Sequence, residues 1–567
     1  MRGGGLGYDP RLRQWLEALL PLAVERGVRL VTNMGAADPV GAGEAAVEVA
    51  RALGLPALRV ACGGEPAEAQ AREDGGSCYT YLGAEVVVEA MRQGADLVLL
   101  GRVADPSMLV GIAAFEHGWS LTDPRNFDRL ARATMAGHLL ECGFHLTGGY
   151  FAHPEGRAPA GGDFEALAGL SMPFADVGAD GEVVLRKLEG SGGELSRRTC
   201  SQQLIYEVGD PAAYVTPDVS ADFTRVAFRE LSEHAVEAAG AAASGGPPAT
   251  LLRLHAQSAG LKMFMEASLG GRGALERAHW ADRLLRRWME EERPGAQATL
   301  TTSFLGWNAL FLRPASSPEA PLAPGLQEPP EVRVRWDGLF ATREDCEALV
   351  GAAQGLALGG PAGIGGLFVP PQPAPCVRLS RELVDRGVVS WRLRALGAAE
   401  PAIRPAGAGP LAAGAATRTL NGHAAIPAAG EETGFAPPTR HAPAEVLCGR
   451  PACLYDVCHA RSGDKGNSAN VGLVPYDPRD LQRLADVVTP QWAAEVFRPL
   501  LDAGSGAEAV EAKVYRLQGV AALNIVVRPV LDGGVTLSRR VDVHGKSLSD
   551  LVLSQEVVFK RPRLREP

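Results

Sequence analysis

The stretch VRLVTNMGAADP (residues 28–39) decides the fold of the first part of the chain. It begins as a short apolar run of strand character and continues as a polar turn. A helical pattern follows at residues 43–53, and the same order recurs downstream, with a strand at 58–62, a helix at 81–93 and a strand at 96–101. Strands and helices that alternate at this spacing are typical of βαβ units. The sequence therefore predicts an α/β fold with a large parallel sheet.

Two polar loops, residues 33–39 and residues 102–107, directly follow strands of this predicted sheet. Ligands of parallel sheets bind at the carboxyl ends of the strands. Asn33 begins the first loop, and Arg102 in the second can pair with a carboxylate or a phosphate. Asp105 stands before a proline and is equally suited to capping the next helix. We predict that Asn33, Arg102 and Asp105 contact the substrate.

The stretch GHLLECGFHLTGGY (residues 137–150) brings two His, a Glu, a Cys, a Thr and four Gly into fourteen residues. A helical pattern over residues 130–140 runs into glycine, which indicates a helix end followed by a tight polar turn. Groups that exchange protons then stand beside backbone N–H groups that can face a ligand. The alternative is a glycine-rich turn needed only for close packing.

Each polar group of this stretch has an expected role in catalysis. Glu141, with His138 or His145, can transfer protons next to a carbonyl group, and Cys142 is a weaker candidate nucleophile because isolated cysteines are more often packed thiols. The N–H groups of Thr147, Gly148 and Gly149 can stabilise an enolate-like oxygen. A metal site formed by His138, Glu141 and His145 is a further alternative.

Composition narrows the class of protein. The 567 residues carry a net charge of -10, which argues against a general nucleic-acid binder and against docking on anionic membranes. The longest apolar runs, such as residues 95–100, are far shorter than the ~20 residues of a membrane span. The nine cysteines are dispersed without a CxxC pair, and the first ten residues lack a signal-peptide pattern. We expect a cytoplasmic protein with a small-molecule partner, and a homo-oligomer is left open.

The sequence also predicts a second, smaller domain. Residues 396–450 are rich in Ala, Pro and Gly and are predicted to link a domain at 1–395 to one at 451–567. The loop RSGDKGNSAN (residues 461–470) lies between two predicted strands of the smaller domain. It is not a Walker A loop, because its lysine precedes the glycine. We predict that five of its residues bind substrate: Arg461, Asp464, Lys465, Asn467 and Asn470. The alternative is a polar turn in which Asp464 and Lys465 form a surface pair of little value.

Several of these segments together resemble the acyclic terpene utilisation AtuA family, whose large domain was described as DUF1446. The resemblance rests on residues 32–36, 101–107 and 137–149, and on residues 203–207, 210–211 and 214–222. Residues 461–470 and 538–546 resemble the small ferredoxin-like domain that ends members of this family. The resemblance runs through nearly the whole chain in the family's order. It implies a ferredoxin-like α+β fold for the smaller domain.

The resemblance further implies a role in the breakdown of acyclic terpenoids, or of related branched acids as acyl-CoA thioesters. Family members usually begin with a glycine-rich strand and helix that precede the first residues here, so we expect that segment to be missing from this sequence. No cofactor is evident, and a CoA thioester is the expected form of substrate. Among the reactions, a hydration, dehydration or other lyase-type step suits the residues available.

An alternative is a non-catalytic binding or assembly subunit that works beside a carboxylase or dehydrogenase. It is favoured by the lack of the common catalytic and cofactor motifs GxGxxG, HExxH and GxSxG.

Overall fold

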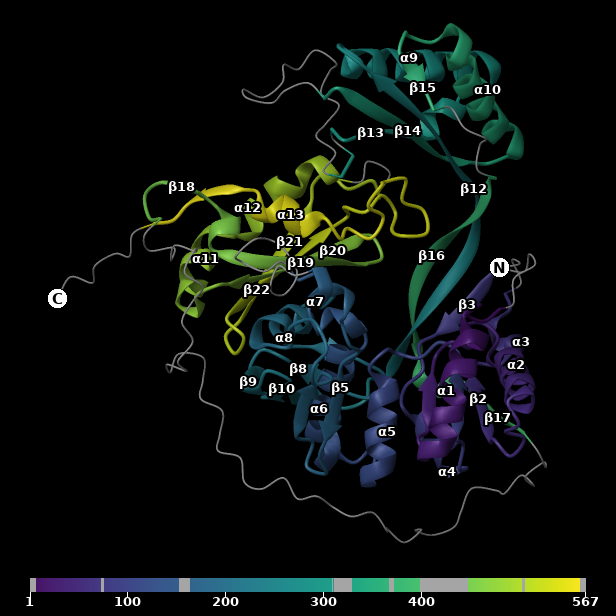
Figure 1. Cartoon of the computed structure of the whole chain (residues 1–567), viewed down its shortest axis with the longest axis vertical. Helices are drawn as coiled ribbons and strands as arrows, with labels where there is room; N and C mark the ends of the chain where they lie inside the picture. The colour runs from purple at the N-terminus through teal and green to yellow at the C-terminus, as the bar shows by residue number, and fades with distance from the viewer. Residues whose placement is uncertain are drawn as a thin grey trace, which may run out of the picture.

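The structure is a computed structural model that describes residues 7–72, 76–151, 164–307, 309–310, 329–366, 372–397, 447–501 and 505–560. Figure 1 shows the N-terminal α/β unit at the lower right and a middle unit beside it. A long β-ribbon leads from these to a unit at the top, and the C-terminal domain lies above the middle unit. The predicted linker at 396–450 falls almost entirely outside the described residues.

The N-terminal unit has the predicted βαβ order. Its sheet has the strand order β1-β4-β2-β17, in which β4 pairs in parallel with β1 and β2, and β17 pairs antiparallel with β2. The strands are β1 (Leu30–Thr32), β2 (Val60–Gly64), β4 (Leu97–Leu100) and β17 (Arg392–Leu396). The helices of this part are α1 (Leu12–Arg26), α2 (Pro39–Ala52), α3 (Ala67–Gln70), α4 (Glu85–Arg92) and α5 (Ser107–His117).

Helix α2 begins earlier than the sequence pattern predicted. The predicted start was residue 43, but the Asp38 side chain accepts a hydrogen bond from the Gly41 N–H at 2.8 Å and caps the helix four residues earlier. Pro39 then occupies the first helical position, where its missing N–H costs nothing. The loop before α2 lies directly against the end of β4, because a Cβ added at Gly35 would stand 2.5 Å from the Leu100 carbonyl oxygen. The two predicted ligand loops therefore begin side by side.

The middle unit is built around helix α6, which is buried along most of its length. Antiparallel sheets cover it, in the strand orders β5-β6-β10-β9 and β11-β8-β7. The helices are α6 (Phe127–Leu140), α7 (Phe164–Ala168) and α8 (Arg197–Leu204). The strands are β5 (Phe174–Val177), β6 (Val183–Arg186), β7 (Tyr214–Val215), β8 (Ser220–Asp222), β9 (Ala227–Ser232), β10 (Ala235–Ala239) and β11 (Ala242–Gly245).

A 21-residue strand, β12 (Thr250–Gly270), joins the units. Near its start it pairs with β3 (Ser77–Thr80) and β16 (Ala374–Asp385), and near its end with β14 (Glu331–Phe340). Two helices pack on the far end of this sheet, as Figure 1 shows. The remaining elements there are α9 (Ala274–Glu292), β13 (Leu300–Leu305), α10 (Arg343–Gly359) and β15 (Ile364–Gly365). The α/β class is thus confirmed, while the parallel pairing among the described strands is confined to β1, β4 and β2.

The C-terminal domain is an antiparallel sheet of order β19-β20-β22-β21, with helices on one face. Alternate residues of each strand point to opposite faces. Val471 and Leu473 join the core beneath the helices, whereas Val474 joins the core of the middle unit. The elements are β18 (Pro451–Cys453), β19 (Cys458–Lys465), β20 (Ser468–Pro475), α11 (Leu481–Val487), α12 (Pro490–Phe497), β21 (Glu511–Leu517), β22 (Ala522–Arg528), α13 (Leu548–Leu553) and β23 (Glu556–Val558).

Within the described ranges, no helix combines the length and the apolar character needed to cross a membrane.

Candidate active site between the two domains

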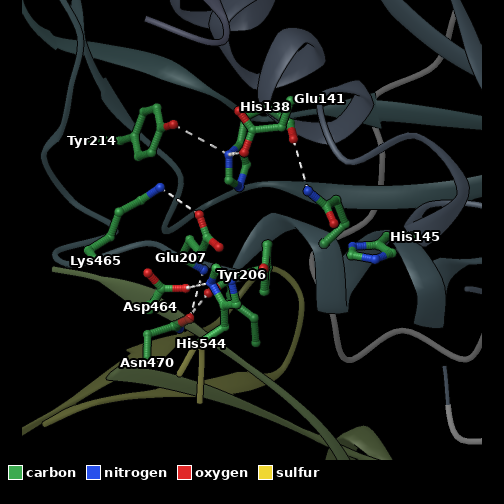
Figure 2. Close-up of polar contacts among 12 residues, drawn as sticks. His138, Glu141, His145, Tyr206, Glu207, Tyr214, Asp464, Lys465, Asn470 and His544 are labelled. Carbon is green, nitrogen blue, oxygen red and sulfur yellow. Dashed lines mark hydrogen bonds and ion pairs between the residues drawn. The ribbon is translucent and has the colours of Figure 1, made fainter. Parts of the chain in front are cut away.

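The open face of the C-terminal sheet packs against helix α8 and the turn that follows it. Two glycines of that face allow the close approach. A Cβ added at Gly472 would lie 2.4 Å from Ile205 Cδ1, and one at Gly463 would lie 2.5 Å from the Tyr206 ring. Side chains from four distant parts of the chain meet at this contact, as Figure 2 shows.

The end of helix α6 supplies a histidine and a carboxylate to this meeting point. His138 is fully buried, and its Nε2 lies 3.1 Å from the Leu204 carbonyl oxygen. Because a carbonyl oxygen only accepts, Nε2 donates, and Nδ1 is left to face Glu141 and Tyr214. Nδ1 lies 3.5 Å from Glu141 Oε1 and 3.4 Å from the Tyr214 hydroxyl (Figure 2). His138 and Glu141 therefore stand in side-chain contact, as the two members of a proton-transfer pair do.

Tyr214 completes this group. Burial, together with the charge of Glu141, raises its pKa well above that of a free tyrosine. The phenol therefore keeps its proton at neutral pH and acts as a hydrogen-bond donor.

The C-terminal domain contributes cations. Lys465 Nζ lies 2.5 Å from Glu207 Oε2, and Lys546 Nζ lies 3.4 Å from Glu207 Oε1 and also donates to the Tyr206 hydroxyl. Burial lowers the pKa of Lys465, but the charges of Glu207, Glu141 and Asp105, with Glu207 the largest among them, together outweigh this effect, so the net pKa is raised. Lys465 is therefore a fixed positive charge, and 58% of its side chain is still exposed.

The loop after β4 reaches the same place. Burial and the charge of Glu141 raise the pKa of Asp105, while Lys465 and Arg102 lower it to a smaller extent. Asp105 is exposed to solvent and directly precedes Pro106, which packs against helix α6: a Cβ added at Gly137 would lie 2.8 Å from Pro106 Cα. Arg102 is also exposed, and its guanidinium carbon stands 5.1 Å from the centre of the Tyr81 ring. The cluster thus combines accessible cations with carboxylates.

A buried arginine separates this cluster from His145. Arg461 is 4% exposed, donates to Gln203 Oε1 at 2.6 Å and to His145 Nδ1, and stacks 3.6 Å from the centre of the Tyr206 ring. Burial lowers its pKa to about 10, so it remains charged at neutral pH.

The environment of Arg461 decides what two predicted catalytic residues can do. Burial and the Arg461 charge lower the pKa of His145 to about 3, so His145 is a neutral acceptor. Burial and Glu141 raise the pKa of Cys142, which keeps its thiol protonated. Neither environment suits a base or a thiolate nucleophile at neutral pH. A role for Glu141 and His138 in proton transfer remains a prediction.

The glycine turn after α6 corrects one prediction. The N–H groups of Thr147 and Gly149 both donate to the Phe144 carbonyl oxygen, at 3.2 and 2.8 Å, and so do not face a ligand. The Thr147 hydroxyl donates to the Ser171 carbonyl oxygen at 2.8 Å. Gly148 has a φ of 112°, which a side chain would strain. The Thr147 and Gly149 N–H groups are therefore engaged within the turn, which favours the close-packing alternative, while a binding role for Gly148 stays a prediction.

The remaining predicted residues are engaged within the chain. Asn33 directly follows β1, and its backbone carbonyl accepts from Ala36 N–H. Asp464 Oδ1 lies 3.2 Å from His544 Nδ1, and burial raises the pKa of Asp464. Asn467 Oδ1 accepts from Leu531 N–H at 2.9 Å, and Asn470 binds the turn after α8. Of these, Asp464 and Asn470 appear beside Glu207 in Figure 2.

The metal alternative finds no geometric support. In the part of the chain that the structure describes, no group of three or more His, Cys, Asp or Glu side chains could hold a metal ion. His145 in particular binds Arg461 through its Nδ1.

Three members of the cluster were not assigned a role from the sequence: Glu207, Tyr214 and Lys546. Glu207 meets the lysines only where the C-terminal domain contacts the turn after α8, and Tyr214 reaches His138 from 76 residues further along the chain, so no local spacing reveals them. The sequence pointed to these three residues only indirectly. They lie in segments on which the family resemblance rests, namely residues 203–207, 214–222 and 538–546.

The fold and cluster define a two-domain α/β protein with a polar site between its domains. Two family models match its sequence. The model of the acyclic terpene utilisation family protein AtuA matches residues 1–73 and 63–395, and that of the AtuA ferredoxin-like domain matches residues 452–558. The chain therefore belongs to the AtuA family, as its sequence resemblance predicted, and the C-terminal domain is ferredoxin-like. No curated protein and no solved structure matches it significantly. The family is implicated in acyclic terpene utilisation, which agrees with a catabolic role.

Proposed function

We propose that the chain is an enzyme that acts on acyclic terpenoids or related branched acids, as free acids or CoA thioesters, in a hydration, dehydration or related lyase step. The observation that carries the proposal is that Glu141 and Tyr214 both lie beside His138 Nδ1, while Lys465 pairs with Glu207 at the same domain contact (Figure 2). Glu141, Tyr214 and Lys465 come from three different segments of the chain. They supply a carboxyl group, a protonated phenol and a cation.

The roles follow from these environments. The His138–Glu141 pair exchanges a proton with the substrate, and the accessible carboxyl of Asp105, with its raised pKa, is suited to donate one. The Tyr214 phenol stays protonated and can donate to an enolate-like oxygen. Lys465 and Arg102 are accessible cations for a carboxylate or a CoA phosphate.

Solvent deuterium tests this proposal directly, because a lyase or hydratase exchanges a proton between water and carbon. Branched acids and acyl-CoAs incubated with the protein in D2O should acquire deuterium next to the carbonyl, as read by mass spectrometry. Glu141→Gln should slow incorporation by about 10²–10⁴-fold. Glu511→Gln, in an exposed ion pair of the C-terminal sheet, is the matched control. Incorporation by Glu141→Gln at the wild-type rate would sink the assignment.

A second candidate function is a non-catalytic assembly subunit, and strand β16 favours it. Residues 378–383 of this strand are all exposed, including Leu379 and Leu383, at 46% and 69%. Consecutive exposed residues on a strand are a common site of chain pairing. Under this candidate, Leu383→Asp should lower the particle mass measured by light scattering. A particle mass equal to that of the wild type would show that β16 does not support the assembly-subunit candidate.

A further inference from the structure

Two buried asparagines of the C-terminal sheet hold the turn after helix α8. Asn470 on β20 and Asn524 on β22 are 5% and 0% exposed, and both point from the sheet toward the large domain. Asn470 Nδ2 donates to Asn524 Oδ1 at 2.6 Å, which links the two amides into one unit. Polar groups this deeply buried need hydrogen-bond partners, because a buried donor or acceptor without one destabilises the fold.

Those partners are backbone groups of the turn. Asn470 Oδ1 accepts from Glu207 N–H at 2.7 Å, and its Nδ2 donates to the Ile205 carbonyl oxygen at 2.8 Å. Asn524 Nδ2 donates to the carbonyl oxygens of Val208 and Gly209 at 2.8 and 3.0 Å. The network fixes the orientation of both amides, because a flipped Asn470 would place its donors against the Glu207 N–H.

The residue at the centre of the turn has an unusual backbone. Glu207 has a φ of 57°, a left-handed conformation that is unfavourable for a residue with a side chain. Its N–H is bound by Asn470, while its carboxylate lies against Lys465 and Lys546 of the same C-terminal domain. The strained residue is thus held at both its backbone and its side chain from across the domain contact.

We propose that Asn470 and Asn524 are positioning residues, which hold the turn so that the Glu207 carboxylate faces Lys465 and Lys546. The catalytic consequence rests on the function proposed above, whereas the geometric claim does not. Docking of the ferredoxin-like domain then does more than bring its lysines to the site. It also sets the direction of a carboxylate that belongs to the large domain.

The proton affinity of Lys465 reports this geometry without any substrate. Because Glu207 raises the pKa of Lys465, a displaced carboxylate should release more of the unprotonated amine near pH 8. Limited acetylation followed by peptide mass spectrometry measures that amine residue by residue. Lys513, exposed on β21 of the same domain, serves as the internal control in each digest.

The variants for this measurement are Asn470→Ala, Asn524→Ala and Glu207→Gln. Each should acetylate Lys465 several-fold faster than the wild type, because the pKa of the amine falls when the Glu207 carboxylate no longer faces it. Adding Asn470→Ala to Glu207→Gln should give no further acceleration, because the amide then has no carboxylate to position. Asn470→Asp keeps the size and the acceptor but loses the donor to Ile205, and it should give an intermediate rate.

Wild-type acetylation of Lys465 in both Asn variants, together with faster acetylation in Glu207→Gln, would overturn the proposal. Equal acceleration at Lys465 and Lys513 would also overturn it, because it would show general loosening of the domain. Where deuterium incorporation is observed, the Asn variants should lower kcat more than they raise KM. Unchanged acetylation of Lys465 in the Asn variants would contradict the positioning role of the asparagines. Absence of deuterium incorporation alone would contradict the proposed function and leave the positioning role standing.

Discussion

The two faces of the C-terminal sheet differ in chemistry although they belong to the same strands. The face beneath α11 and α12 carries apolar residues such as Val471, Leu473 and Ile525, which form a core with Phe497. The opposite face carries His459, Arg461, Asn470 and Asn524, all buried against the large domain. The first face makes the domain fold. The second makes it dock in one orientation, because buried polar groups tolerate few alternative partners.

The largest expected effect comes from the apolar face. Phe497 is fully buried at the end of α12, and Phe497→Ala should lower the free energy of unfolding of the C-terminal domain by about 3–5 kcal/mol. Denaturant unfolding followed by tryptophan fluorescence measures the loss. A loss below about 1 kcal/mol would show that this face does not hold the domain together.

A smaller effect is expected at the polar face. Arg461→Met should weaken docking by roughly 2 kcal/mol, because it removes a hydrogen bond to Gln203 and a desolvated stacking contact with Tyr206. Hydrogen exchange of the turn at residues 205–209 should quicken, while exchange in α12 stays as in the wild type. Equal quickening in both places would contradict the separation of the two faces.

Only the polar face is expected to respond to mild acid through His145. Its pKa is lowered to about 3 by burial and Arg461, so the docked state disfavours the protonated ring. The docking stability contributed by this group is therefore present above pH ~6.5 and declines as the pH falls from there toward 3. His145→Gln should flatten this part of the pH dependence of exchange at residues 205–209. A profile that the substitution leaves unchanged would contradict it.

The smallest effect is expected away from both faces. Glu511 and Arg528 form an ion pair on the exposed edge of the sheet, with side chains 64% and 63% exposed. Glu511→Gln should change the melting temperature by about 1–2 °C at most, since exposed pairs contribute ~0–1 kcal/mol. A larger drop would mean that surface charge, and not the chemistry of the faces, governs the stability of this domain.

Local patterns predicted the parts of the fold that depend on local physics. Apolar runs followed by polar turns gave the strands near residues 30, 60 and 98, and the alternation with helices predicted their parallel pairing. Strand β12 was not predicted, because its pairing partners β3 and β16 lie more than 100 residues away in the chain. The start of α2 was also missed, because a side-chain cap at Asp38 outweighed the apolar pattern.

The candidate site likewise contains residues that the sequence predicted and residues that it did not. The sequence singled out His138, Glu141, Asp105 and Lys465 from their residue types and their loops, and the structure brings them into one electrostatic cluster. It could not show Glu207, because this residue depends on the left-handed turn and on docking. The N–H groups near residue 148 looked available in sequence, but folding turned two of them onto the Phe144 carbonyl oxygen.

Under the proposed function, a small acid or acyl-CoA binds between the two domains. The most direct test is thermal stabilisation of the wild type, Lys465→Met and Lys513→Met by a panel of branched acids and acyl-CoAs. A ligand at a hundredfold excess over Kd adds about 2.7 kcal/mol of stability. If the ligand binds beside Lys465, the wild type and Lys513→Met should show saturable stabilisation, and Lys465→Met should show none. Equal stabilisation of all three proteins would contradict a ligand site at the domain contact.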